Sequence, residues 1–103
     1  MELFKNLIYE YKKGMRDLSI HTCSKEDQPQ FTEFLEKLNT RYILTSPSND
    51  KVNIFFGDPN CLKILSKFSS EQLERLTPYE DFILGIMLGY SRTEQYNRIL
   101  SRI

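Results

Sequence analysis

Residues 52–59 are Val52-Asn53-Ile54-Phe55-Phe56-Gly57-Asp58-Pro59, and they contain the end of a predicted strand and the start of a predicted helix. Val52, Ile54 and Phe56 alternate with the residues between them, which is the period-2 pattern of a strand. Gly57 interrupts that pattern. Asp58-Pro59 is typical of a helix N-cap followed by proline at the first helical position.

The segments on either side extend this strand–helix unit. On the N-terminal side, residues 41–45 alternate as a strand, and the turn-forming residues 46–50 join them to residues 52–56. Because the loop is short, we expect the two strands to pair antiparallel. On the C-terminal side, the predicted helix carries an apolar stripe formed by Cys61, Leu62, Leu65 and Phe68.

Another helix is predicted to begin at Pro29, before this pair of strands. Its apolar side chains recur at i, i+3, i+4 and i+7, at Phe31, Phe34, Leu35 and Leu38. Asn39 is a suitable residue for its C-terminal cap.

The N-terminal region contains two alternating runs, residues 7–12 and residues 18–22, which predict a β-hairpin. Leu7, Tyr9 and Tyr11 would share one face of the first strand. Gly14, between the runs, would supply the positive φ that the turn needs.

The C-terminal region predicts a short turn ending near Leu76 and then two helices. Thr77-Pro78-Tyr79-Glu80 is a capping box that starts a helix over Pro78–Tyr90, which is apolar almost all round. Gly85 and Gly89 in this helix predict tight packing on a neighbour. Ser91-Arg92-Thr93-Glu94 is a second capping box, and the helix that follows has Tyr96, Ile99, Leu100 and Ile103 along one face.

The predicted order of elements is ββαββα followed by further helices. We therefore expect a single domain over residues 1–103, of the two-layer α+β class. It would have an antiparallel sheet of about four strands with helices on one face and a helical C-terminal region. The stretch Leu18–Phe68 would form a βαββα unit, ferredoxin-like in part.

The composition excludes several broad classes of function. The chain has 103 residues, with 14 basic and 14 acidic side chains, and a neutral net charge argues against a general binder of nucleic acid or acidic membranes. The longest uncharged apolar stretch, Phe82–Tyr90, is too short to span a bilayer, and no signal peptide is visible. We expect a soluble cytoplasmic protein that binds neither nucleic acid nor membrane.

Candidate reactive residues are few. Cys23 and Cys61 lie in no C-x-x-C pattern, and His21 is the only histidine, so no metal site or cofactor is expected. The cysteines are expected to be reduced, although a disulfide between them stays open. Cys61 is either a thiolate favoured by a helix N-terminus or a small buried hydrophobe. His21 is either a base assisted by Asp17 or a half-exposed strand residue on the outer face of the sheet.

Two further places are candidate binding sites. The junction at Gly57 is the kind of strand-to-helix turn that can bind phosphate, but no nucleotide motif accompanies it. The predicted first hairpin gathers aromatic and basic residues, which are suited to an acidic protein surface or to RNA. Its predicted partner-binding residues are Tyr9, Tyr11, Lys12, Lys13 and Arg16. Solvation alone would also explain charge at a hairpin tip.

Three segments together resemble a small bacterial family of about this length, known only as a domain of unknown function. They are Ile8-Tyr9-Glu10-Tyr11-Lys12-Lys13-Gly14, Asn53-Ile54-Phe55-Phe56-Gly57 and the run from Leu76 through Thr77-Pro78-Tyr79-Glu80-Asp81-Phe82 to Tyr90. The resemblance implies a mixed α/β bacterial domain without an established activity, cofactor or catalytic residue. The family pattern has a histidine, then isoleucine or histidine, before Tyr-Glu-Tyr, whereas this chain has Asn6-Leu7 before Ile8, so a role for that histidine does not transfer.

These observations favour a non-catalytic binding or accessory protein that acts through protein–protein contacts. It would have an unidentified protein partner, or form a homodimer through the C-terminal helices. One alternative is a thiol-dependent redox accessory protein, and the resemblance adds an association with flavodoxin neighbours in the genome. A small-ligand-binding regulatory module is the other.

Overall fold

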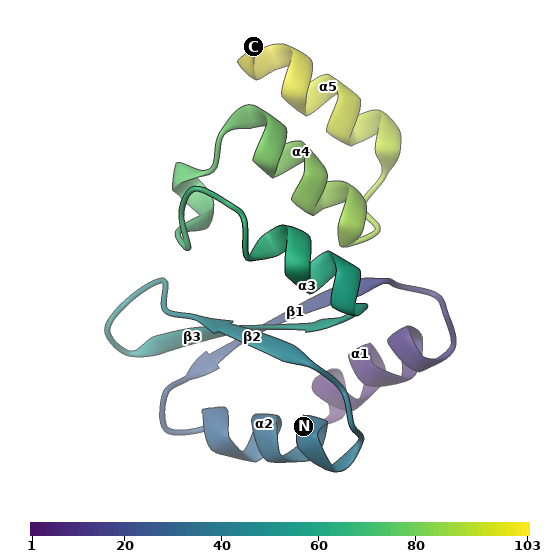
Figure 1. The fold of residues 1–103 in the computed structure, drawn as a ribbon, viewed down its shortest axis with the longest axis vertical. Helices are drawn as coiled ribbons and strands as arrows, with labels where there is room; N and C mark the ends of the chain where they lie inside the picture. The colour runs from purple at the N-terminus through teal and green to yellow at the C-terminus, as the bar shows by residue number, and fades with distance from the viewer.

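A computed structural model of the chain describes residues 1–103 and shows an α+β fold, drawn in Figure 1. It has five α-helices, one short 3-10 helix and a three-stranded antiparallel sheet. In chain order the elements are α1 Glu2–Lys12, β1 Leu18–Ser24, α2 Gln28–Lys37, β2 Tyr42–Thr45, β3 Lys51–Gly57, α3 Pro59–Leu65, η1 Leu73–Arg75, α4 Pro78–Met87 and α5 Arg92–Arg102.

The sheet has the strand order β1-β3-β2, and β3 pairs antiparallel with both of its neighbours. Phe56 of β3 lies opposite Ser19 of β1 and Tyr42 of β2. The antiparallel pairing predicted for residues 41–45 and 52–56 is therefore confirmed. Because β1 and β2 are both edge strands, each leaves one row of main-chain groups without a partner strand.

The sheet is covered by helices on both faces, so the prediction of two layers with helices on one face is wrong. Figure 1 shows α1 and α2 on one side of the sheet, α3 and α4 on the other, and α5 outermost. Helices cover both faces because the side chains of the central strand β3 are buried on both faces of the sheet. Val52, Ile54 and Phe56 pack with α1 and α2. Phe55 packs with α3 and α4.

The predicted N-terminal hairpin is also wrong, because residues 7–12 belong to helix α1. Phe4, Leu7, Ile8 and Tyr11 have the i, i+3, i+4, i+7 spacing of an amphipathic helix, and Phe4 and Ile8 are buried against the sheet. Residues 7–12 fit both the period of a strand and the period of a helix. The burial of Phe4 against the sheet favours the helix. The sheet consequently has three strands rather than four, and the order ββαββα is replaced by αβαββα.

The predictions from Leu18 to Phe68 hold for the order of elements. The sequence βαββα is present, but α2 and α3 lie on opposite faces of the sheet. Asn39 follows α2 with a φ of 52°, as expected of a C-terminal cap. Asp58 caps α3 through a hydrogen bond of 2.8 Å from the backbone N–H of Asn60.

The C-terminal helices begin where the capping motifs predict. Thr77 and Glu80 form the reciprocal capping box of α4, and the Ser91 side chain accepts from the backbone N–H of Glu94 at the start of α5. No helix of the chain combines the length and apolar character that a membrane crossing requires.

Candidate protein-binding surfaces

The five predicted partner-binding residues lie at the C-terminal end of α1 and in the loop after it, and they do not form one exposed group. Tyr9 is 59% exposed, and the ammonium of Lys13 lies 5.7 Å from the centre of its ring. Lys12 is exposed too, and its Nζ lies 3.4 Å from the carbonyl oxygen of Leu38 at the end of α2. These three residues remain accessible to a partner.

Arg16 is occupied within the chain. Its Nε donates to a carboxylate oxygen of Glu10, and its Nη1 donates to the carbonyl of Leu88 at 2.9 Å. Leu88 is the C-cap of α4, where carbonyls lack helical partners and attract positive charge. Arg16 therefore joins the loop after α1 to the end of α4.

Tyr11 is half-buried. Burial raises the pKa of its hydroxyl, and the charges of Asp58, Cys61 and Asp17 raise it further. Arg16 thus serves the fold, Tyr11 is half-buried, and Tyr9, Lys12 and Lys13 form the exposed part of the predicted group.

His21 lies on the face of β1 that packs against α1 and α2, so its predicted place on the outer face is wrong. Its ring is 5.1 Å from that of Phe4 and 4.6 Å from that of Phe31, measured between centroids. Burial lowers the pKa of His21, and the positive N-terminus lowers it further. No carboxylate forms an ion pair with it, and Asp17 is not its partner.

Neither cysteine has the environment of a reactive thiol. Both are buried and unpaired. Burial raises the pKa of Cys61, and Asp58 and Asp17 raise it further, and the residue packs among hydrophobic side chains as a small hydrophobe would. Burial likewise raises the pKa of Cys23. Cys23 packs in the cluster under α1 and α2, and Cys61 packs in the cluster on the other face of the sheet.

The Gly57 junction is closed by the protein's own groups. A Cβ on Gly57 would lie 2.3 Å from the carbonyl oxygen of Asp17, so the two backbones touch. That carbonyl also accepts a hydrogen bond of 2.8 Å from the backbone N–H of Asp58. No three His, Cys, Asp or Glu side chains come together as a metal site would require.

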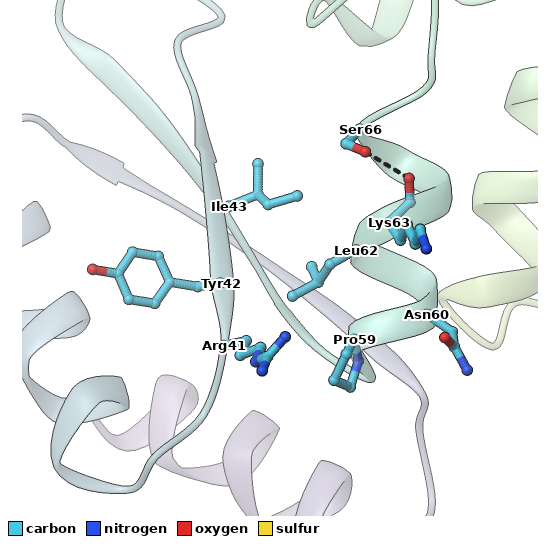
Figure 2. Close-up of a pocket in the computed structure, with 8 residues that line it drawn as sticks. All are labelled: Arg41, Tyr42, Ile43, Pro59, Asn60, Leu62, Lys63 and Ser66. Atoms are coloured by element: carbon cyan, nitrogen blue, oxygen red, sulfur yellow. Dashed lines mark hydrogen bonds between the residues drawn. The ribbon is translucent and has the colours of Figure 1, made fainter.

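A groove that the sequence did not predict runs between β2 and α3 (Figure 2). Its volume is about 710 Å³, and its lining residues are Arg41, Tyr42, Ile43, Pro59, Asn60, Leu62, Lys63 and Ser66. A second cavity of about 330 Å³ adjoins it, since Ile43 and Ser66 line both. The groove exists because α3 packs beside an edge strand, and no local pattern in the sequence indicates that pairing.

An apolar face on α4 and α5 is the other exposed feature. Large side chains repeat along the exposed side of α4 at Tyr79, Ile83 and Ile86, and Tyr90 is exposed in the turn that follows the helix. The apolar residues predicted along one face of α5 include Tyr96, Leu100 and Ile103, which are also exposed. The rings of Phe82 and Tyr96 stack with centroids 6.0 Å apart, which joins α4 to the apolar row of α5. We call these residues the C-terminal apolar face.

Comparison with known families finds one family model that matches the chain. The family model described as "Protein of unknown function (DUF2023)" matches residues 2–102. The chain belongs to this family. The match confirms the resemblance to a small family of unknown function and covers nearly the whole chain. No curated protein is similar enough to the chain to count as a match.

Proposed function

We propose that this chain is a non-catalytic, protein-binding accessory domain, and that its C-terminal apolar face binds a second copy of the chain. The exposed row on α4 supports this proposal most directly. Monomeric proteins seldom expose a continuous row of large apolar side chains, and such patches usually mark interaction sites.

The spacing of the row indicates what kind of element covers it. Within α4, Tyr79, Ile83 and Ile86 are separated by four and three residues. That is the spacing of positions a and d in a helical seam, which packs against another helix. The occupant that fits is therefore a helix with the same apolar spacing.

A second copy supplies such a helix. Most homo-oligomers are two-fold dimers in which the same patch of each subunit meets itself. The face here lies at the outer end of the molecule, on α4 and on the outermost helix α5, so a second copy can approach it without meeting the sheet (Figure 1). The dimer would place four helices together, two from each chain.

The buried, unpaired cysteines support a place for this dimer in the bacterial cytoplasm, where thiols stay reduced. Since burial raises the pKa of both thiols, the redox alternative gains nothing from the geometry. Tyr9, Lys12 and Lys13 are proposed as contacts for an acidic protein partner, outside the dimer interface.

Analytical ultracentrifugation over a range of concentrations tests the dimer. We expect the unaltered chain to sediment as a dimer and Ile83→Glu and Leu100→Glu to sediment as monomers, because each places a charge in the apolar contact. Ile64→Glu is the matched control, since Ile64 is also exposed but lies on α3. A chain that stays monomeric at every concentration, or variants that dimerise like the control, would overturn the proposal.

A further inference from the structure

The outer edge of β2 presents free main-chain groups. The backbone N–H of Gly57 donates to the carbonyl of Arg41, so Arg41 and Gly57 form a hydrogen-bonded pair in the antiparallel ladder. Such pairs alternate along the ladder with pairs that are not hydrogen-bonded. The N–H and C=O groups of Tyr42 and Leu44 therefore point outward, away from β3, where no strand follows β2 in the sheet.

The groove between β2 and α3 gives access to this edge. Figure 2 shows the Tyr42 ring pointing away from α3, although Tyr42 lines the groove, so its main chain is the part that faces the groove. In the same view Ile43 and Leu62 point toward one another across the space between strand and helix. These side chains make an apolar floor beside the free main-chain groups.

The charge of the groove is positive. Arg41 and Lys63 line it, neither takes part in an ion pair, and no carboxylate lines it. The carboxylate of Asp58, next to Pro59, is already bonded to the backbone N–H of Asn60.

The adjoining cavity extends the groove along β2. Its hydrophobic lining residues are Ile43, Phe55, Leu65, Phe68, Leu73 and Leu76. Thr45, at the end of β2, also lines it, and its hydroxyl is buried without a hydrogen-bond partner. Buried polar atoms are rarely left unpaired, which makes this hydroxyl a candidate contact for a bound group.

We infer that this groove binds an extended acidic segment of a partner protein, which adds to the sheet as a fourth strand beside β2. Main-chain hydrogen bonds to Tyr42 and Leu44 would supply affinity, as in other cases of strand addition. Acidic side chains of the segment would lie near Arg41 and Lys63. Because side chains of a strand alternate, an apolar residue an even number of positions away would enter the adjoining cavity.

Fluorescence anisotropy with a labelled synthetic peptide tests this inference. The probe alternates glutamate with threonine and has one central leucine, and a counterpart has lysine in place of glutamate. We expect only the glutamate peptide to bind, and hydrogen exchange at the Tyr42 and Leu44 amides to slow when it does. Combining Arg41→Glu with Lys63→Glu should weaken binding by about tenfold or more, because the charges meet at the rim of the site.

The main-chain contact has its own variant. Leu44→Pro removes an N–H that points outward, so it deletes no bond to β3, and proline is tolerated on edge strands. We expect that the Leu44→Pro variant does not bind the peptide and that the Leu44→Ala variant does. Circular dichroism should show that both variants fold. Lys25→Glu is the charge control, because Lys25 follows β1 at the end of the sheet opposite Arg41.

Any of four outcomes would overturn the inference. The glutamate peptide fails to bind the unaltered chain, or it binds equally well after charge reversal at Arg41 and Lys63, or Leu44→Pro retains it. A single-stranded oligonucleotide that displaces the peptide at equal charge would instead identify a site for nucleic acid. None of these outcomes depends on the dimer, which is measured on a different face.

Discussion

Gly57 carries two structural requirements in a single residue. Its φ of 143° lies where side chains are rarely found, and a Cβ there would lie 2.3 Å from the carbonyl oxygen of Asp17. The atom in the way is backbone, which cannot rotate aside as a side chain can. Gly14 shares only the first requirement, because its φ is 76° and nothing lies within 4 Å of a Cβ built on it.

We predict that Gly57→Ala destabilises the chain by about 3 kcal/mol or more, because it combines strain with overpacking. Gly14→Ala should cost only about 1–2 kcal/mol, the ordinary price of a left-handed residue. Urea unfolding of the two variants measures the difference. An equal loss of unfolding free energy in the two variants would show that the contact with Asp17 does not affect stability.

Glu80 does more than complete the capping box of α4. Its carboxylate accepts from the hydroxyl and the backbone N–H of Ser69, each at 2.6 Å, and from the backbone N–H of Thr77 at 3.0 Å. These hydrogen bonds, led by that from the Ser69 hydroxyl, lower the pKa of Glu80 from 4.5 to about 2. Glu80 therefore holds the segment after α3 against the start of α4.

The lowered pKa predicts how stability changes in acid. Since Glu80 binds its proton more weakly in the folded chain than in the unfolded chain, its stabilisation is complete above pH 4.5 and is lost as the pH falls toward about 2. Glu80→Gln should reduce that loss across the interval, when urea unfolding is followed against pH. Glu33→Gln, on the exposed side of α2, should leave the pH dependence unchanged.

Helices α4 and α5 are joined by both packing and charge. A Cβ on Gly85 would lie 2.0 Å from Oε1 of the buried Gln95, so the helices approach closely at this glycine, as the sequence predicts. Asp81 bonds Arg98 through two contacts, at 2.6 and 3.2 Å, and lies 3.3 Å from Arg102. Asp81 is thus the one carboxylate that serves two arginines of α5.

At this scale we predict that Asp81→Asn loosens α5 from α4. Hydrogen exchange at the amides of α5 should become faster, while exchange in the strands stays the same, because the ion pairs involve no sheet residue. Glu74→Gln, which alters an exposed carboxylate in η1 that forms no ion pair, is the control. Faster exchange throughout the chain would contradict the prediction.

Elements with their own start and stop signals could be predicted from the sequence. The helices that follow Asp58-Pro59 and Thr77-Pro78 begin at those residues because capping groups and proline act locally. Helix α1 could not be predicted in the same way, since its N-cap makes no side-chain hydrogen bond. Leu7, Tyr9 and Tyr11 alternate as in a strand, and only the burial of Phe4 and Ile8 by distant residues decides between helix and strand.

At the scale of the whole molecule, α1 forms part of the core rather than a mobile arm. Phe4 is fully buried, and its ring meets those of His21, Phe31, Phe34 and Phe56. We predict that Phe4→Ala costs about 3–5 kcal/mol, as expected when a large buried ring is removed. Tyr9→Ala, on the exposed side of the same helix, should change stability by no more than about 0.5 kcal/mol in urea unfolding.

The candidate sites were harder to predict because they are assembled from several elements. The sequence predicted a group of aromatic and basic residues from Tyr9 to Arg16. It could not show that Arg16 donates a hydrogen bond to the carbonyl of Leu88 at the end of α4. The groove depends on α3 and β2 lying side by side and on β2 being an edge strand. Both features depend on how the helices and the sheet pack together, and neither hydrophobic periodicity nor capping motifs in the sequence indicate that packing.

The position of the two thiols gives the molecule a pair of internal reporters. Cys23 and Cys61 are buried in separate clusters with the sheet between them. A thiol reagent can reach each one only when its own layer opens. The labelling rates of the two sulfurs therefore report, in one unmodified chain, whether the layers on the two faces unfold together or one before the other.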